Sequence, residues 1–114
     1  ELAEFYTQML FRTAGVQMPQ TTADGKHSYQ SFCILVENRN NIMNKMRESG
    51  IEVQIGTYSL HMHPAFAASD RVRHRGSFEG SRSAFDHCLT LPLYHELEEN
   101  DQRAVVDEMV RAMS

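Results

Sequence analysis

The chain has no tryptophan, only two cysteines and three prolines, and no long run of apolar residues. Because a membrane-spanning helix needs about 20 apolar residues in a row, we expect no membrane span, and no signal peptide is visible. Two cysteines are too few for a disulfide framework. Cys33 and Cys88 both stand in apolar, strand-like surroundings, so we expect two buried, reduced thiols in a cytoplasmic protein.

The charge balance excludes one broad class of function. Eleven basic residues stand against fifteen acidic ones, and a net charge of −4 argues against a general nucleic-acid binder. With 41% hydrophobic and 23% charged residues, the 114-residue chain is typical of a single globular domain, 1–114. An amphipathic pattern starts directly at Glu1, without a methionine, so we expect the chain to be part of a longer protein.

The motifs of common catalytic sites are missing. The sequence has neither Gly-x-Ser-x-Gly nor a glycine-rich loop that would cradle a phosphate. Its two lysines are Lys26, in an expected loop, and Lys45, on the expected exposed side of a helix. Neither has the buried setting that a Schiff-base lysine needs, and we predict no catalytic residue in this chain.

Helices and strands are expected to alternate along the chain. Residues 1–13 predict an amphipathic helix, which ends at Gly15 and Pro19, and residues 17–26 predict a loop. The apolar stripe of this helix consists of Leu2, Phe5, Tyr6, Met9 and Leu10. The remaining elements are a strand over 29–36 that is apolar on both faces, a helix capped by Asn38 and ended by Gly50, a strand over 51–57, a short helix from Ser81 or Ser83, a strand over 89–93 and a last helix from Glu98 or Asn100.

This order predicts an α/β (α+β) fold, in which a small three- to four-stranded sheet is covered by helices on one face. The pattern does not determine the strand order, and a split β-α-β arrangement of the ferredoxin-like kind is the generic expectation. The last helix should bury Val106, Met109, Val110 and Met113. The broad apolar stripe of the first helix favours self-association, so we expect a weak dimer or an exposed apolar patch.

Tyr58 and His61 are the candidate binding residues. They follow the strand over 51–57, where Gly56 permits close backbone approach, and a phenol and an imidazole there can both point into a cleft. The alternative interpretation is that Tyr58 packs and His61 caps a turn.

Arg71, Arg73 and Arg75 form a basic group in an acidic chain and are candidate phosphate ligands. The alternative is a solvated, mobile loop over 71–80. No aromatic residue is interleaved with these arginines, which weakens a nucleic-acid interpretation further.

A metal site is the remaining chemical alternative. His61 and His63 are two residues apart, and His74 follows, so a small metal-dependent enzyme can be imagined on these three side chains. No spacing among the histidines and cysteines matches a known metal pattern, and we predict no metal site.

Five segments, in the right order, resemble the DegT/DnrJ/EryC1/StrS family of sugar aminotransferases that use pyridoxal phosphate (PLP). The sequence departs from the family pattern in the basic stretch 71–80 and at Thr90, where serine is usual. The segments are Lys26-His27-Ser28-Tyr29 with Phe32; Arg39-Asn40 with Arg47-Glu48-Ser49-Gly50-Ile51; Tyr58, Leu60, His61, Pro64 and Phe66; Ser83 with Leu89-Thr90-Leu91-Pro92-Leu93-Tyr94; and the last helix from Glu98.

The resemblance implies the C-terminal small domain of a fold-type-I aminotransferase. Such an enzyme moves an amino group, usually from glutamate, to a nucleotide-linked keto-sugar for amino-sugar or polysaccharide biosynthesis. Its catalytic lysine and PLP contacts belong to an N-terminal large domain that this chain lacks, so the chain alone is expected to be inactive and to bind no PLP. Residues 1–24 would be the helix and linker from the preceding domain.

The same resemblance implies that this domain supplies part of the substrate cleft and of a homodimer contact, with Tyr58 and His61 on the cleft wall. The alternative is a stand-alone ferredoxin-like module that binds a ligand or regulates. The sequence does not identify the sugar, the nucleotide or the amino donor.

Overall fold

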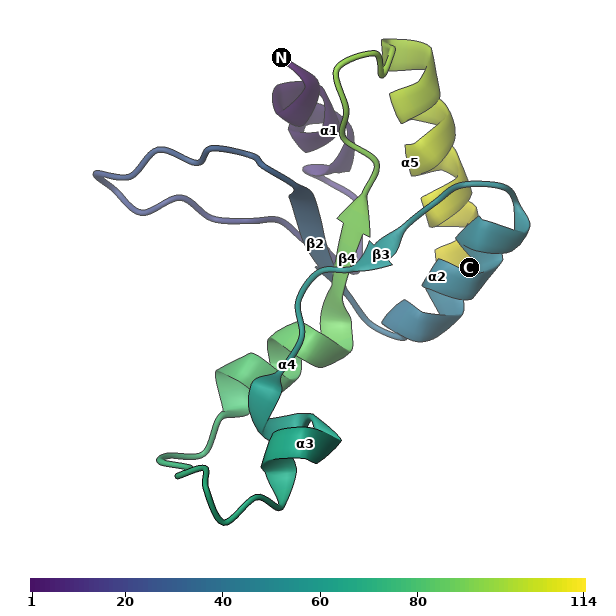
Figure 1. Cartoon of the computed structure of the whole chain (residues 1–114). Coiled ribbons are helices and arrows are strands. Elements are labelled where there is room, and N and C mark those ends of the chain that lie inside the picture. The colour runs from purple at the N-terminus through teal and green to yellow at the C-terminus, as the bar shows by residue number, and fades with distance from the viewer.

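The computed structural model describes all 114 residues, and its four strands form one antiparallel sheet in the order β1-β2-β4-β3 (Figure 1). The expected α/β architecture is therefore confirmed. The elements are α1 (Leu2–Leu10), β1 (Val16–Gln17), β2 (Phe32–Val36), α2 (Arg39–Glu48), β3 (Gln54–Ile55), the short 3-10 helix η1 (Leu60–Met62), α3 (Pro64–Ala67), α4 (Glu79–His87), β4 (Cys88–Leu91) and α5 (Glu99–Met113).

The last strand in the sequence lies between two earlier ones. β4 pairs antiparallel with β2, through Phe32–Leu91 and Ile34–Leu89, and also with β3, through Gln54–Thr90. β2 and β3 consequently run in the same direction, joined by α2, with β4 between them. This is the split β-α-β arrangement that was expected. The strands predicted over 29–36, 51–57 and 89–93 do share one sheet, although each is shorter than predicted.

Three long helices cover one face of the sheet. α5 packs against both α1 and α2, and all three lie on the same side of the strands (Figure 1). In β2 the residues alternate between buried and half-buried, so only one face of this strand belongs to the core, contrary to the prediction. None of the helices combines the length and the apolar character needed to cross a bilayer. The large side chains that are buried completely include Tyr6, Leu10, Phe32, Ile34, Met46, Leu89, Leu91 and Met109.

The first helix is part of this core, so the prediction of an exposed stripe is wrong. Tyr6 and Leu10 are fully buried, and the Tyr6 hydroxyl donates to the carbonyl of Pro92 at 2.9 Å. The amide of Gln102 donates to the carbonyl of Leu2, which ties α1 to α5. Phe5, at the edge of the stripe, lies under the guanidinium of Arg103. That residues 1–24 also link to a preceding domain stays a prediction.

The last helix buries Val106 and Met109 as predicted, but Val110 is 42% exposed and Met113 is half-buried. Each residue turns a helix by about 100°, so Val105, Val106 and Ala112 all lie within about 60° of Met109, whereas Val110 lies about 100° from it and falls outside the buried face. The helix begins after Glu98, whose carboxylate accepts from the backbone of Asp101 while the Asp101 side chain accepts from Glu98 in return.

Three local predictions for the second helix have different outcomes. Gly50 has a φ of +81°, as a residue that ends a helix in the left-handed region should. Asn38 stands at the N-cap position, but its own backbone is left-handed and its side chain forms no capping bond, so the predicted cap is wrong. Lys45 is half-buried instead of exposed, because its ammonium donates to the carbonyl of Ala112 at the end of α5.

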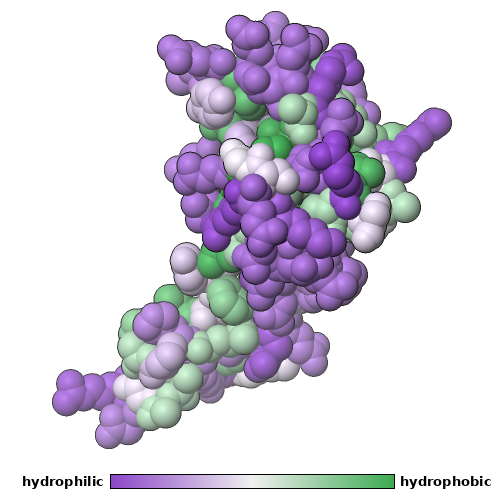
Figure 2. Space-filling view, turned by 90° about the vertical axis from the view of Figure 1, so that its right-hand side faces the viewer, coloured by the Kyte–Doolittle hydropathy of each residue, from purple (hydrophilic) through white to green (hydrophobic).

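Residues 57–87, which we call the lobe, project away from the end of the sheet (Figure 1). The lobe contains η1, α3 and α4, and Ser59 is its only buried residue. Figure 2 shows apolar surface on this projecting part of the molecule. The large hydrophobic side chains that the lobe exposes are Tyr58, Leu60, Phe66 and Val72.

Candidate functional site

The lobe starts where the chain leaves the sheet after β3, and Gly56 holds the chain against β4 at that position. The Gly56 amide donates to the carbonyl of Cys88 at 2.9 Å, and a Cβ at Gly56 would lie 2.0 Å from the Cys88 sulfur. The predicted close approach is therefore confirmed. Tyr58 follows at once, is 73% exposed, and tilts against the ring of Phe85 on α4, with 6.3 Å between the ring centroids.

His61 lies in η1 and is held by two serines. Its Nδ1 is 2.8 Å from the hydroxyl of Ser59, which is itself 2.9 Å from the hydroxyl of Ser81 on α4. The ring stacks on Phe78, with 4.6 Å between centroids. The other ring nitrogen, Nε2, is buried and has no hydrogen-bond partner. A buried ring nitrogen without a partner is costly, so this atom is the strongest local sign of an interaction that the chain alone does not supply.

Phe78 holds an unusual backbone conformation beneath that histidine. Its φ is +56°, in the left-handed region that costs a bulky L-residue roughly 1–2 kcal/mol. The ring is in contact with two imidazoles, stacked on His61 and edge-on to His74. Such a conformation persists only where the surroundings enforce it, and here it places an aromatic surface against His61.

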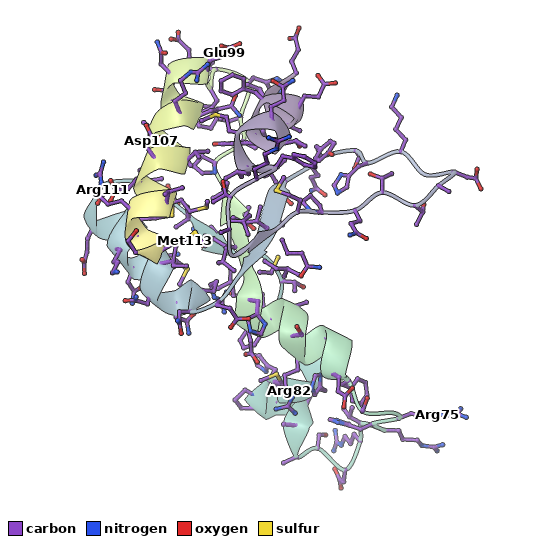
Figure 3. The ribbon with its side chains drawn as sticks, turned by 180° about the vertical axis from the view of Figure 1, so that it is seen from behind. Arg75, Arg82, Glu99, Asp107, Arg111 and Met113 are labelled. Atoms are coloured by element: carbon purple, nitrogen blue, oxygen red, sulfur yellow. The ribbon has the colours of Figure 1, made fainter.

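The basic loop lies between α3 and α4. Arg71, Arg73 and Arg75 are all exposed, and none of them forms an ion pair with a carboxylate. Figure 3 shows Arg75 extending from the far end of the lobe and Arg82 projecting from α4. The lobe has four arginines against three carboxylates, whereas the rest of the chain has seven basic and twelve acidic residues. Positive charge is thus concentrated in the lobe.

The histidines of the lobe do not converge on a metal site. His63 accepts a hydrogen bond from the amide of Ala65 and caps α3, and His74 Nε2 lies 3.1 Å from the carbonyl of Phe66. No three His, Cys, Asp or Glu side chains lie close enough together to hold a metal ion. The small metal-dependent enzyme considered on His61, His63 and His74 therefore has no geometric basis.

The two cysteines are neighbours on the face of the sheet that points away from the helices. Both are free, and both are half-buried instead of buried as predicted. The Cys33 sulfur lies 3.2 Å from the hydroxyl of Thr90. Burial, with a smaller contribution from Cys33, raises the pKa of Cys88 from 9.0 to about 11. At neutral pH this thiol keeps its proton and is a poor nucleophile.

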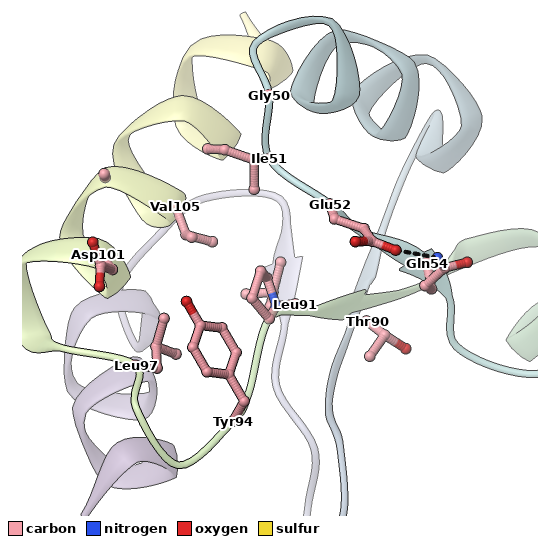
Figure 4. Close-up of a pocket in the computed structure, with 12 residues that line it drawn as sticks. Gly50, Ile51, Glu52, Gln54, Thr90, Leu91, Tyr94, Leu97, Asp101 and Val105 are labelled. Atoms are coloured by element: carbon pink, nitrogen blue, oxygen red, sulfur yellow. Dashed lines mark hydrogen bonds between the residues drawn. The ribbon is translucent and has the colours of Figure 1, made fainter.

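One apolar-lined cavity lies outside the lobe. It has a volume of about 550 Å³ and lies between β3, the end of β4 and the first half of α5 (Figure 4). Ile51, Leu97 and Val105 supply apolar lining, while Glu52 and Asp101 make it acidic. None of its lining residues has a buried polar atom without a partner.

Comparison with known proteins identifies the family. The model of the DegT/DnrJ/EryC1/StrS aminotransferase family matches residues 1–110. The chain belongs to this family. Its fold is that of the C-terminal region of these aminotransferases.

Three relatives illustrate the match. The dTDP-4-dehydro-2,3,6-trideoxy-D-glucose 4-aminotransferase of Saccharopolyspora spinosa is 29% identical over 99% of this chain and 29% of its own length. DesV of S. venezuelae, solved with a ketimine intermediate, is 25% identical with a TM-score of 0.83, over 96% of this chain and 29% of that one. Spr1654 of Streptococcus pneumoniae, solved in its PLP form, shares the fold with a TM-score of 0.80 at 15% identity, over 98% of this chain and 29% of that one. The chain spans about 30% of the length of the curated relatives.

The family segments take on distinct structural roles. Leu89, Thr90 and Leu91 form the central strand, and Gly50 ends α2. Arg39, cited above only as part of a family segment, proves to be a buried side chain that joins α2 to α4. Ser59 was likewise not predicted. Its sequence signal was weak, because a serine beside two aromatic or histidine residues is common.

Proposed function

We propose that this chain is the C-terminal domain of a PLP-dependent aminotransferase that acts on a nucleotide-linked keto-sugar in amino-sugar or polysaccharide biosynthesis in the cytoplasm. The lobe would form one wall of the sugar-binding cleft and part of a homodimer contact. The observation that carries the proposal is the lobe itself, which has one buried residue yet holds His61 with a partnerless buried nitrogen. The aminotransferase names of the family relatives support the chemistry.

The composition of the lobe surface supports a contact with the rest of such an enzyme. A segment of 31 residues with only Ser59 buried has almost no apolar core to stabilise it. Exposed aromatic and aliphatic side chains that gather on one projecting element are typical of interaction surfaces. A family member is about three times as long as this chain, so the remainder of the aminotransferase, in the same subunit or its partner, is the natural occupant.

The side chains of the lobe suit the parts of a nucleotide-sugar. The exposed phenol of Tyr58 can donate to or accept from a sugar hydroxyl. His61 Nε2, although buried in the chain alone, has one hydrogen bond left to make. The unpaired guanidiniums of Arg71, Arg73 and Arg75 suit the diphosphate, because an arginine can bind two phosphate oxygens at once.

The residues of this chain do not fit PLP itself. The Lys45 ammonium is engaged with the carbonyl of Ala112, and Lys26 lies on the exposed loop between β1 and β2. Neither lysine presents an amine in a cleft beside phosphate-binding groups. In the proposed enzyme the cofactor is held by the other domain, and this chain binds and orients the sugar.

The stand-alone ligand-binding module would use the cavity beside β3. Its apolar floor with two carboxylates would suit a small cationic ligand. The family match and the partnerless nitrogen of His61 both favour the cleft wall instead. Calorimetric titration of the chain with small amines, giving one-to-one binding in that cavity, would favour the module.

The proposal is tested by substitutions of His61 in the full-length aminotransferase. The side-chain amide of asparagine can replace Nδ1 and that of glutamine can replace Nε2. If Nε2 binds the sugar or a group that orients it, His61→Ala and His61→Asn should both raise KM for the sugar about tenfold, a loss of about 1.4 kcal/mol. His61→Gln should recover part of that loss.

Two controls make the assay decisive. His95→Ala removes an exposed histidine outside the lobe and should leave KM for the sugar unchanged. Spectra of bound PLP should be the same in all variants. If His61→Ala and Tyr58→Phe both leave the sugar kinetics at wild-type values, the lobe is not the wall of the cleft.

A further inference from the structure

Arg39 is a buried cation with no ion-pair partner. It is 3% exposed, forms no ion pair, and is the first residue of α2. Burial lowers the pKa of its guanidinium below the usual range. The positive end of the α2 dipole lies at the same place, so the charge is unfavourable to its own helix. A side chain held under these conditions needs compensation from another element.

That compensation comes from the end of α4. Arg39 Nη2 donates to the carbonyl of Phe85 at 2.7 Å, and Nη1 donates to the carbonyl of Cys88 at 3.2 Å. The guanidinium also lies 5.8 Å from the centre of the Phe85 ring. The carboxyl end of a helix carries partial negative charge and free carbonyls, so the cation stabilises α4. One side chain of the sheet-and-helix body thereby ties the carboxyl end of α4 to the start of α2.

α4 in turn contacts the segment that carries both candidate binding residues. Phe85, whose carbonyl Arg39 binds, packs on the ring of Tyr58. Four residues earlier, Ser81 reaches Ser59, and Ser59 reaches Nδ1 of His61. A continuous series of contacts therefore leads from Arg39 through α4 to Tyr58 and His61.

We propose that Arg39 is a positioning residue, which holds the end of α4 against the start of α2 and so sets where Tyr58 and His61 stand in the sugar cleft. The functional part of this inference rests on the proposed function. The locking of α4 stands on the hydrogen bonds alone.

The test compares Arg39→Met, Arg39→Lys and Arg47→Met in the full-length aminotransferase. Arg47 is the control, because its guanidinium also donates from two nitrogens to the backbone, here to the single carbonyl of Val53, but lies outside the lobe. Because α4 would no longer be held in place, Tyr58 and His61 should be displaced in Arg39→Met, and kcat/KM for the sugar should fall about tenfold to 100-fold. Arg39→Lys keeps the charge but not the planar fork, so it should recover only part of this loss. Arg47→Met should match the wild type.

Two further measurements separate positioning from general destabilisation. Hydrogen exchange by mass spectrometry should show faster exchange in α4 of the Arg39 variants and unchanged exchange in α5. Combined with His61→Ala, Arg39→Met should add little further loss, because both changes act on the same contact. If Arg39→Met does not fold, hydrogen exchange, sugar kinetics and the combination with His61→Ala are measured with Arg39→Lys instead.

The outcomes also distinguish the two proposals. Faster exchange of α4 amides in the Arg39 variants, together with normal sugar kinetics for His61→Ala, would support the positioning of α4 by Arg39. It would overturn the proposal that the lobe is a wall of the sugar cleft. Impaired kinetics for His61→Ala, with wild-type exchange and kinetics in both Arg39 variants, would overturn the role of Arg39.

Discussion

At the scale of single residues, Gly56 and Gly80 form a natural pair for a stability test. A Cβ at Gly56 would enter the van der Waals radius of the Cys88 sulfur and come within 2.8 Å of the Cys88 Cβ, whereas a Cβ at Gly80 meets nothing within 4 Å. Gly56→Ala must push two paired strands apart and should cost about 1–3 kcal/mol of unfolding free energy. Gly80→Ala lies in α4 and should gain about 0.4–1 kcal/mol.

Denaturant midpoints of the two variants and the wild type measure both effects. Equal stability of Gly56→Ala and the wild type would mean that β3 and β4 are not packed as closely as described.

The Cys88 thiol predicts a pH dependence of stability. Its pKa is raised from 9.0 to about 11 in the folded chain, chiefly by burial, so the folded state keeps a proton that the unfolded state releases. Its contribution to stability is complete below pH 9 and is lost as the pH rises from 9 to 11. In this range the unfolding free energy should fall more steeply in the wild type than in Cys88→Ala, by at most about 1.4 kcal/mol per pH unit.

Chemical unfolding at a series of pH values gives both slopes directly. Identical slopes for the two proteins would show that Cys88 titrates alike in the folded and unfolded states.

Residue-level prediction from the sequence succeeded where the cause is local. Gly50 must be left-handed because it ends a helix, and that requirement can be read from its neighbours. Arg39 and Ser59 were missed because their partners lie elsewhere: Arg39 binds Phe85 and Cys88 more than 45 residues later, and Ser59 meets Ser81. A partner at such a distance leaves no trace in local composition.

At the scale of elements, the lobe and the helical layer should differ in local stability. α5 buries five residues against the sheet and its neighbours, while η1, α3 and α4 bury none. Amides of the lobe should therefore exchange through local opening at a lower free energy than amides of β2, β4 and α5. Residue-resolved hydrogen exchange of the chain by NMR measures this difference, and lobe amides protected to the level of α5 would contradict it.

The elements predicted most accurately are those with a long periodic pattern. α1 and α5 repeat apolar residues over two or more turns, and α2 is bounded by Asn38 and Gly50; all three were placed within a few residues. β1 was missed because two residues show no period, and it exists only by pairing with the end of β2. Val110 was misplaced because it lies one step outside the buried face, where composition does not distinguish a core valine from a surface valine.

At the scale of the whole molecule, the fold class followed from the alternation of helices and strands, but the strand order did not. Nothing in the apolar pattern of β4 tells that it enters between β2 and β3. The outward projection of the lobe also escaped prediction, since its apolar residues resemble those of a core segment and only their exposure reveals the difference.

The position of β4 has a consequence for synthesis on the ribosome. β2 and β3 are joined in the sheet only through β4, so they cannot come together until residues 88–91 have been synthesised. In the first helix, Tyr6 bonds to Pro92 and Leu2 bonds to Gln102, which lie 86 and 100 residues further along the chain. Contacts so remote in sequence form slowly and only once both ends exist. A nascent chain that has not yet released its last helix therefore has no finished core, and the apolar face of its first helix stays uncovered until residues 88–113 have emerged.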